Sequence, residues 1–209
     1  MIVNPKFFSQ QGEDILLAGW IGEKADVFWI DVGAWHPEND SVTKYFYDRG
    51  GHGINIEPVP EMFAPFPEAR PRDVNLCCAC GDKGGKQVLT VMHETGLSTM
   101  DEENAARLVP GAPAKVERIM VDVFTLANIC QRYVADKHID FLKIDCEKFE
   151  RQVLLGADFH NFRPDYLCIE STLPGTMIPS YAEWEPIVFE AGYEFIIERG
   201  VNRYYHRMR

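Results

Sequence analysis

The sequence contains no hydrophobic run long enough to cross a bilayer. Its longest apolar stretch, Ile15–Ile21, falls far short of the roughly 20 residues that a transmembrane helix requires. Positive charge is also scarce, since 21 Lys and Arg stand against 32 Asp and Glu and leave a net charge of -11. That balance repels a phosphate backbone, so we expect no nucleic acid as the principal partner. The opening residues, Met1 to Lys6, lack the basic and then apolar segments of a secretory leader.

A disulfide framework is missing as well. Cys77, Cys78 and Cys80 crowd one strand-like run, and the other cysteines are scattered singly among apolar neighbours. The three clustered cysteines fit no zinc spacing, and the alternation of a strand sends Cys77 to the face opposite Cys78 and Cys80, so we expect buried strand packing here. The expectation is a reduced, cytoplasmic protein.

Internal repeats and low-complexity tracts are absent, and 209 residues with 46% hydrophobic content predict a single globular domain spanning residues 1–209. Short apolar runs instead alternate with amphipathic segments. The predicted strands cover residues 27–31, 53–57, 74–80, 139–145, 166–170, 193–197 and 201–205. The predicted helices cover residues 9–21 approximately, 41–49, a segment opened by Pro58 and Pro60, 126–134, 147–156 and 181–191.

The order of these elements predicts the fold class. Strands separated by helices pair in parallel through right-handed crossovers. The last two strands are joined only by Glu198-Arg-Gly200, a link that permits only an antiparallel hairpin. Residues 86–123 approximately read as strands around an acidic helix, which indicates an inserted strand and loop region. The prediction is a three-layer, Rossmann-like α/β fold with a mostly parallel seven-stranded sheet and a terminal antiparallel hairpin.

Four of the predicted strands end in an acid: Asp31, Glu57, Asp145 and Glu170. In open α/β sheets, ligands bind at the carboxyl ends of the strands. One acid at that edge would be ordinary, but four that converge on it predict a functional site.

The turn after the first strand, Asp31-Val-Gly-Ala34, narrows the choice of ligand. Gly33 would let the backbone approach a ligand, yet the second and third glycines of a dinucleotide fingerprint are absent. Asp31, just before this glycine, would repel the phosphate of a ligand and would favour a ligand with a positive charge or a hydroxyl group. Glu57 lies 26 residues after Asp31, at the position where a carboxylate accepts ribose hydroxyls. NAD and S-adenosylmethionine both satisfy that last rule, so Glu57 alone does not decide between them.

Several short motifs, taken in order and spacing, resemble the FkbM-type class I S-adenosylmethionine-dependent methyltransferases over almost the whole chain. They are Ser9-Gln-Gln-Gly-Glu-Asp14, Asp31-Val-Gly-Ala34 with His36-Pro37, Ser41-Val-Thr43, Gly53-Ile-Asn-Ile-Glu-Pro58, Arg70-Pro-Arg-Asp73, Gly96-Leu-Ser-Thr99, Lys143-Ile-Asp145 with Glu147, and Asn202-Arg-Tyr204. The resemblance implies the class I methyltransferase fold and S-adenosylmethionine as the cofactor.

The resemblance also implies roles for individual residues in holding the cofactor. Asp31, Gly33 and Ala34 would line its methionine end, and Ser41 and Thr43 would hydrogen-bond its carboxylate or amine. Glu57 beside Pro58 would bind the ribose, the region from Cys80 to Asp82 would hold the adenine, and Asp145 is a further candidate for binding the cofactor. Trp35 either walls the cofactor cleft or, as an aromatic residue after a buried strand, packs in the core. One departure concerns the acceptor pocket. The family usually reads Asp-Val-Glu-Gly after the fourth strand, whereas this chain reads Asp145-Cys-Glu-Lys148.

Candidates for handling the acceptor's proton lie on the same edge of the sheet. They are His36, Asp145, Glu147 and Glu170. Imidazole is a common general base, but His36 is equally suited to capping its turn, and Glu147 is equally suited to the first turn of a helix. Asp145 and Glu170 end neighbouring strands and are the residues that would hold Mg²⁺, although no third or fourth ligand is evident.

The leading hypothesis is therefore an S-adenosylmethionine-dependent transferase that methylates a hydroxyl on a sugar, glycan or secondary metabolite. One alternative is an NAD-dependent oxidoreductase on the same kind of sheet. Another is a cofactor-binding module without catalysis, in which Lys148 fills the acceptor pocket. The sequence leaves the acceptor and the oligomeric state open.

Overall fold

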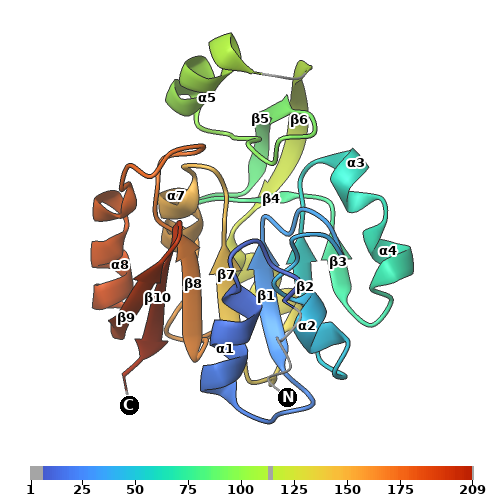
Figure 1. Cartoon of the computed structure of the whole chain (residues 1–209), viewed down its shortest axis with the longest axis vertical. Helices are drawn as coiled ribbons and strands as arrows, with labels where there is room; N and C mark the ends of the chain where they lie inside the picture. Colours follow the sequence, from blue (N-terminus) through green and yellow to red (C-terminus); the bar gives the residue numbers. More distant parts are fainter. Residues whose placement is uncertain (1–6, 113–114, 209) are drawn as a thin grey trace, which may run out of the picture.

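A seven-stranded sheet forms the centre of the protein in the computed structural model, which describes residues 7–112 and 115–208 (Figure 1). Its strands are β1 (Phe28–Val32), β2 (His52–Ile56), β3 (Val74–Leu76), β7 (Phe141–Ile144), β8 (Tyr166–Glu170), β9 (Tyr193–Arg199) and β10 (Asn202–Arg207). Their spatial order is β3-β2-β1-β7-β8-β10-β9. Pairing is parallel from β3 to β8, and β10 runs antiparallel to both β8 and β9. This confirms the predicted sheet and its terminal hairpin.

Helices cover both faces of this sheet. On one face lie α1 (Glu13–Ile21) and α2 (Lys44–Tyr47), and on the other lie α6 (Leu126–Tyr133), α7 (Glu150–Leu155) and α8 (Glu185–Glu190). The short helices α3 (Pro60–Phe63) and α4 (Phe66–Ala69) connect β2 to β3. Within the described ranges, no helix has both the length and the apolar character needed to span a membrane.

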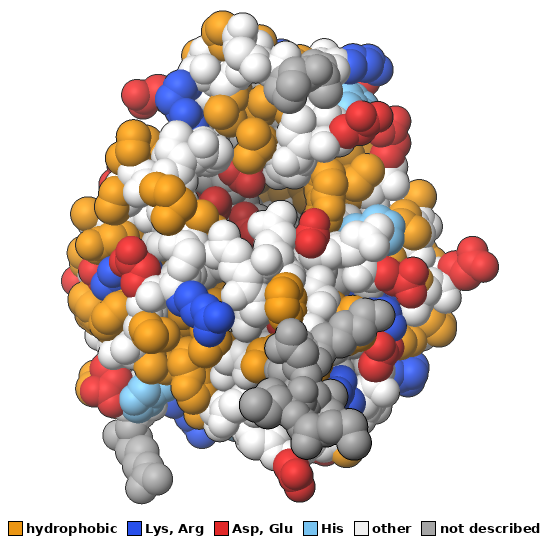
Figure 2. Space-filling view, in the orientation of Figure 1, with side chains coloured by type: hydrophobic (Ala, Val, Ile, Leu, Met, Phe, Trp, Pro, Cys, Tyr) orange, Lys and Arg blue, Asp and Glu red, His pale blue; other side chains and the backbone are white. Residues whose placement is uncertain are grey.

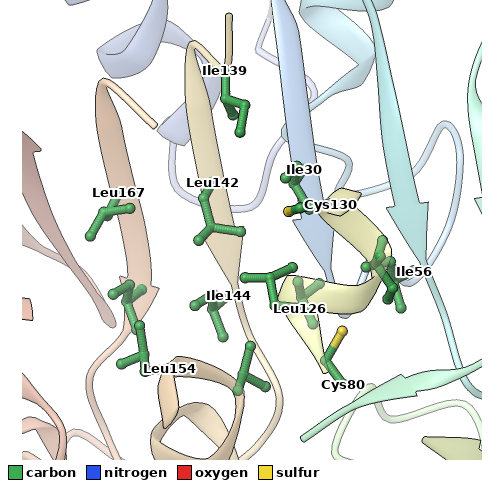
Figure 3. Packing of buried hydrophobic residues seen from close by; sticks show 14 of the residues in the cluster. Ile30, Ile56, Cys80, Leu126, Cys130, Ile139, Leu142, Ile144, Leu154 and Leu167 are labelled. Carbon is green, nitrogen blue, oxygen red and sulfur yellow. The ribbon is translucent and has the colours of Figure 1, made fainter. Parts of the chain in front are cut away.

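The period of two along each strand explains the three layers, because it sends alternate side chains to opposite faces. Ile30 and Leu142 pack with Leu126 of α6, as Figure 3 shows. Trp29 and Phe141 point the other way, into the cluster beneath α1 and α2. The central strands β1, β7 and β8 are thus buried on both faces by the described helices, and a ligand is expected at their carboxyl ends.

The region predicted as an insertion forms, together with β4, a second, three-stranded sheet in the order β4-β6-β5. Its strands are β4 (Ala79–Cys80), β5 (Gly85–Met92) and β6 (Val116–Phe124). The helix α5 (Glu102–Leu108) and the 3-10 turn η1 (Val109–Gly111) lie between β5 and β6. Asp101 caps α5 by accepting a hydrogen bond from the Asn104 amide. Figure 1 shows this region projecting beyond the carboxyl ends of the central strands.

Several predicted elements have other bounds in the structure. The expected strand 74–80 is split, because Leu76 ends the pairing with β2 and the chain then crosses to pair β4 with β6. Cys77, at the crossing, is exposed, whereas Cys78 and Cys80 are buried, and all six cysteines are free.

Two further differences have backbone causes. The N-terminal helix begins at Glu13 rather than near residue 9, because Gly12 adopts a left-handed conformation with φ of 82°. The helix expected over 147–156 begins only at Glu150, because Glu147 and Lys148 both have positive φ. The last predicted helix is divided into the 3-10 turn η2 (Tyr181–Glu183) and α8.

Candidate functional site

A cavity of about 580 Å³ lies between the carboxyl ends of the central strands and the inserted sheet. The order of strands reverses between β1 and β7, because β2 and β3 follow β1 to one side while β7 and β8 are added on the other. Such a switch point is where parallel sheets open a crevice. Figure 2 shows acidic side chains within the hollow below the inserted region. The predicted site residues that line the cavity are Asp31, Gly33, Ala34, Trp35, Glu57, Pro58, Cys80, Asp145, Glu147 and Glu170.

Four predicted site residues lie outside the cavity lining: His36, Ser41, Thr43 and Asp82. The Nδ1 atom of His36 accepts hydrogen bonds from the amides of Glu38 and Asn39, so this side chain caps its own turn. Asp82 is exposed beyond the end of β4.

Ser41 and Thr43 are buried against Arg70 rather than against the cavity. The Arg70 guanidinium donates to Ser41 Oγ at 3.1 Å and to Thr43 Oγ1 at 3.5 Å, and it also binds the carbonyl of Pro37. These contacts tie the loop after β1 to α4 and hold the wall of the cavity in place. The interpretation of both hydroxyls as direct cofactor ligands therefore lacks geometric support among the described residues.

Gly33 is required by a close approach between two strand ends. Its φ is 79°, and a Cβ atom built on it would lie 1.9 Å from the carbonyl oxygen of Asp145. The amides of Gly33 and Ala34 both donate to the carbonyl of Ile56 at 3.0 Å. The absence of a side chain thus lets the β1 turn dock against the ends of β7 and β2, which is a different reason from the ligand approach expected from the sequence.

Glu57 is buried at the end of β2, with only 4% of its surface exposed. Its Oε2 accepts from the Trp35 amide at 2.9 Å and its Oε1 from the Val59 amide at 2.8 Å. Burial raises the pKa of Glu57 to about 7, and the two amides oppose that rise. The carboxylate is therefore held in one orientation at the cavity wall, with lone pairs left for a ligand.

Lys143 lines the cavity although the sequence argument did not single it out as a site residue, and it is the one basic residue in the described lining. Its Nζ lies 3.4 Å from Asp31 Oδ1, 3.4 Å from Asp145 Oδ2 and 3.1 Å from the carbonyl of Gly33. Burial acts to lower the pKa of Lys143, but Asp31 and Asp145 outweigh it and raise that pKa. A lone lysine within the buried strand Phe141–Ile144 was the available sequence signal.

A strained turn carries Glu147 into the cavity. Glu147 and Lys148 have φ of 54° and 81°, a conformation that side chains other than glycine rarely adopt. The turn is held from the inserted region, because Thr99 Oγ1 and Asn104 Nδ2 donate to the Glu147 carbonyl at 2.7 and 3.1 Å. Strain of this kind persists where the surroundings enforce it, and it is typical of functional sites.

Three carboxylates, those of Asp145, Glu147 and Glu170, converge on one wall of the cavity. Each residue contributes one carboxylate oxygen, and these three oxygens all lie within 4.8 Å of one another. Burial, and then repulsion by Asp145, raises the pKa of Glu147 and of Glu170 well above the ordinary value. Three of the four predicted catalytic candidates are thus brought together, and His36 is not among them.

The two ends of the described chain close the cavity from one side. Glu13, at the start of α1, accepts hydrogen bonds from the side chain of Asn202 at 3.1 Å and from the amide of Gln11 at 2.8 Å. Gln11 in turn accepts from the amide of Val201 at 3.0 Å. The N-terminal motif and the hairpin motif, far apart in sequence, therefore form one wall.

The sequence also matches a model of a known protein family. The sequence model of the Methyltransferase FkbM domain covers residues 31–195, which is more than half of the chain. The chain belongs to the FkbM methyltransferase family. No curated protein matches the sequence.

Two solved structures of low sequence identity are similar to this FkbM domain. The methyltransferase FkbM of Methylobacillus flagellatus is 14% identical, with a TM-score of 0.55 over 90% of this chain, and the match spans 45% of that longer protein. A TehB-like SAM-dependent methyltransferase from Corynebacterium glutamicum is 7% identical, with a TM-score of 0.49 over 96% of this chain and 89% of that one. At 14% identity, the match to the FkbM structure shows the fold.

The departure from the family pattern at Lys148 does not obstruct the cavity of this FkbM domain. The Lys148 ammonium pairs with Glu183 at 2.5 Å, and the residue is outside the cavity lining. The hypothesis that Lys148 fills the acceptor pocket is therefore not supported. With φ of 81° at this position, a glycine suits the backbone better than a lysine.

We expect Lys148→Gly to be more stable than Lys148→Ala by about 1 kcal/mol, because only glycine relieves the left-handed backbone. Both variants lose the same ion pair with Glu183, so alanine is the matched control. Urea unfolding monitored by tryptophan fluorescence measures the difference. Equal stability of the two variants would show that the turn is free to relax.

Proposed function

We propose that this domain binds S-adenosylmethionine in the cavity and transfers its methyl group to a hydroxyl of a small-molecule or glycan acceptor. The observation that carries the proposal is the acidic crevice at the switch point of the sheet. Eight carboxylates and one lysine line it: Glu13, Asp31, Asp40, Glu57, Glu94, Asp145, Glu147 and Glu170 around Lys143. Such a lining favours a ligand that carries positive charge and hydroxyl groups, as this cofactor does.

The residues fit the two ends of that cofactor. Glu57 at the end of β2 would accept the ribose hydroxyls, while Asp31, Gly33 and Ala34 would lie along the methionine end. Pro58 and Cys80 line the wall beyond Glu57, where the adenine would lie. The ammonium of Lys143 holds Asp31 and Asp145 in fixed positions, so the acidic wall is set before the ligand arrives.

When bound, S-adenosylmethionine supplies a methyl group that leaves its sulfur as the acceptor oxygen bonds to the carbon and the acceptor loses its proton. The protein's share is to align the acceptor and to favour loss of that proton. Asp145, Glu147 and Glu170 are the side chains placed to do so. Thr99 and Asn104 of the inserted region support this wall through the Glu147 carbonyl, so the insertion helps to shape the acceptor side.

The oxidoreductase alternative is disfavoured by the turn after β1. A dinucleotide site places a helix N-terminus directly after the glycine turn, where it faces the pyrophosphate. Here α2 begins only at Lys44 and has four residues. With the acids of the cavity wall, this arrangement repels a pyrophosphate instead of binding it.

Calorimetric titration with S-adenosylmethionine, S-adenosylhomocysteine and NADH tests the cofactor directly. We expect both sulfur ligands to bind and NADH to give no heat. Binding of NADH alone would overturn the proposal. An acceptor screen of sugars and hydroxylated metabolites, read as S-adenosylhomocysteine produced, then tests the transfer, and tight cofactor binding without turnover on any acceptor would favour the inactive module.

Glu57→Ala is expected to weaken the binding of S-adenosylmethionine by about 1–3 kcal/mol, because the ribose hydroxyls lose a buried carboxylate partner. Glu68→Ala, on the exposed surface of α4, is the matched control and should bind as the parent protein does. Urea unfolding of both variants separates lost binding from lost folding, since Glu57 also holds the amides of Trp35 and Val59. Unchanged affinity in a folded Glu57→Ala variant would remove Glu57 from the site.

A further inference from the structure

The three carboxylates at the ends of β7 and β8 carry more negative charge than the described chain neutralises. The oxygens of Asp145, Glu147 and Glu170 approach within 4.8 Å of one another, and all three residues line the cavity. Like charges at this separation repel strongly where water is largely excluded. The cluster therefore needs either protons or a cation.

Two of its oxygens are both buried and without a hydrogen-bond partner. They are Oε2 of Glu147 and Oε2 of Glu170, and Glu170 as a whole is only 6% exposed. Buried polar atoms in native structures nearly always have a partner, and an orphan oxygen aimed into a cavity indicates a group that the chain itself does not supply. Thr172, just beyond β8, presents a third unpartnered oxygen, its Oγ1, at the same cavity.

Nearby basic side chains are already engaged. Lys143 touches Asp145 but divides its ammonium among Asp31, Asp145 and the carbonyl of Gly33. Lys148 pairs with Glu183, and Arg107 binds Asn104 and the carbonyl of Pro174. Among the described residues, none of these three cations contacts the free oxygens of Glu147 and Glu170.

We propose that Asp145, Glu147 and Glu170 form a binding site for a hard divalent cation such as Mg²⁺ or Mn²⁺. Carboxylate oxygens are the ligands that these ions prefer, and three of them leave coordination positions open toward the cavity. Glu147 is the third ligand that sequence spacing alone did not reveal, and its left-handed backbone is what brings it to the other two.

If the domain transfers a methyl group as proposed, the cation would bind the acceptor hydroxyl. An acceptor hydroxyl that binds a divalent cation loses its proton more readily and is held in a fixed position. This points to acceptors with two neighbouring hydroxyls, as in a sugar or a catechol, because such a pair chelates a cation with open positions. Binding of the metal itself does not depend on that role.

Titration with Mn²⁺, with the free ion followed by electron paramagnetic resonance, tests the site without reference to catalysis. We expect the purified protein to bind a Mn²⁺ ion that Mg²⁺ displaces, and we expect Glu170→Gln and Glu147→Gln each to weaken that binding roughly tenfold or more. Both variants keep the shape of the side chain and remove a repelling charge, so they should fold. Urea unfolding and circular dichroism verify this.

A matched control comes from the other acidic cluster of the described chain. His138, Asp140 and Asp165 also lie within metal-binding reach, at the opposite ends of the strands, but their atoms already pair with one another, with Lys24 and with Arg207. Asp165→Asn should therefore leave Mn²⁺ binding unchanged. Absence of Mn²⁺ binding, or binding lost in Asp165→Asn and kept in both glutamine variants, would overturn the proposal.

The same titration in saturating S-adenosylhomocysteine separates this proposal from the proposed function. We expect Mn²⁺ to bind with or without that ligand. If the ligand abolishes Mn²⁺ binding, the carboxylates hold the ammonium of the cofactor, and the metal site is disproved while the cofactor site stands. If Mn²⁺ binds and neither sulfur ligand does, the metal site stands and the methyltransferase proposal fails.

Discussion

Gly33→Ala is expected to lower the free energy of unfolding by about 3 kcal/mol or more and to abolish cofactor binding. The new Cβ would lie 1.9 Å from the Asp145 carbonyl oxygen and 3.0 Å from its carbon, and the φ of 79° adds backbone strain. Either the turn after β1 or the end of β7 must move, and each carries an acid of the cavity wall. Urea unfolding and calorimetric titration with S-adenosylmethionine measure the two effects.

The matched control is Gly96→Ala. Gly96 has a nearly identical φ of 77°, but a Cβ atom there meets nothing within 4 Å. This variant should lose only the cost of the left-handed backbone, about 1 kcal/mol. If Gly33→Ala were no less stable than Gly96→Ala, the close contact between the two strand ends would not be the reason for the glycine.

Lys143→Met is expected to destabilise the protein by about 3–5 kcal/mol, because it leaves Asp31 buried beside Asp145 without a cation. Asp31 is only 1% exposed, and its Oδ1 lies 3.4 Å from Lys143 Nζ. The loss should appear as a lower midpoint of urea unfolding. It should also weaken the binding of S-adenosylmethionine, since the position of Asp31 is no longer enforced.

Two comparisons make the Lys143 result specific. Lys24→Met breaks a similar pair with Asp140, but Lys24 is partly exposed and Asp140 keeps the Phe28 amide as a donor, so about 1 kcal/mol should be lost. Adding Asp31→Asn to Lys143→Met should restore part of the stability, because it removes the stranded charge. A double variant that is less stable than Lys143→Met would mean that Lys143 contributes packing and not charge balance.

Most of the central sheet could be predicted from local patterns. The segments that become β1, β2, β7 and β8 have four or five residues each and are mostly buried on both faces, which is typical of parallel strands between helix layers. The short link at Gly200 required a hairpin. Ligands bind at the carboxyl ends of such strands, and this rule predicted that the four acids at the strand ends lie together. All four line the cavity: Asp31, Glu57, Asp145 and Glu170.

The structure differs from the local pattern where a contact between distant segments decides the arrangement. Ser41 and Thr43 have hydroxyls suited to a ligand, but Arg70, from another loop, occupies them. Residues 74–80 read as one strand, yet the pairing partner changes from β2 to β6 after Leu76. Neither Arg70 nor β6 is near these residues in sequence, so hydrophobic periodicity could not predict either contact.

The sequence by itself determined the fold through hydrophobic periodicity and the order of its elements. Its motifs gave the resemblance to the FkbM family, and the acids that end the strands predicted the edge of the sheet where the cavity lies. Only the tertiary structure decided that Lys143 bridges Asp31 and Asp145, and that Glu147 joins Asp145 and Glu170. The physical reason is that charge balance and carboxylate separation depend on distances of a few ångströms between side chains from different strands, which packing alone sets.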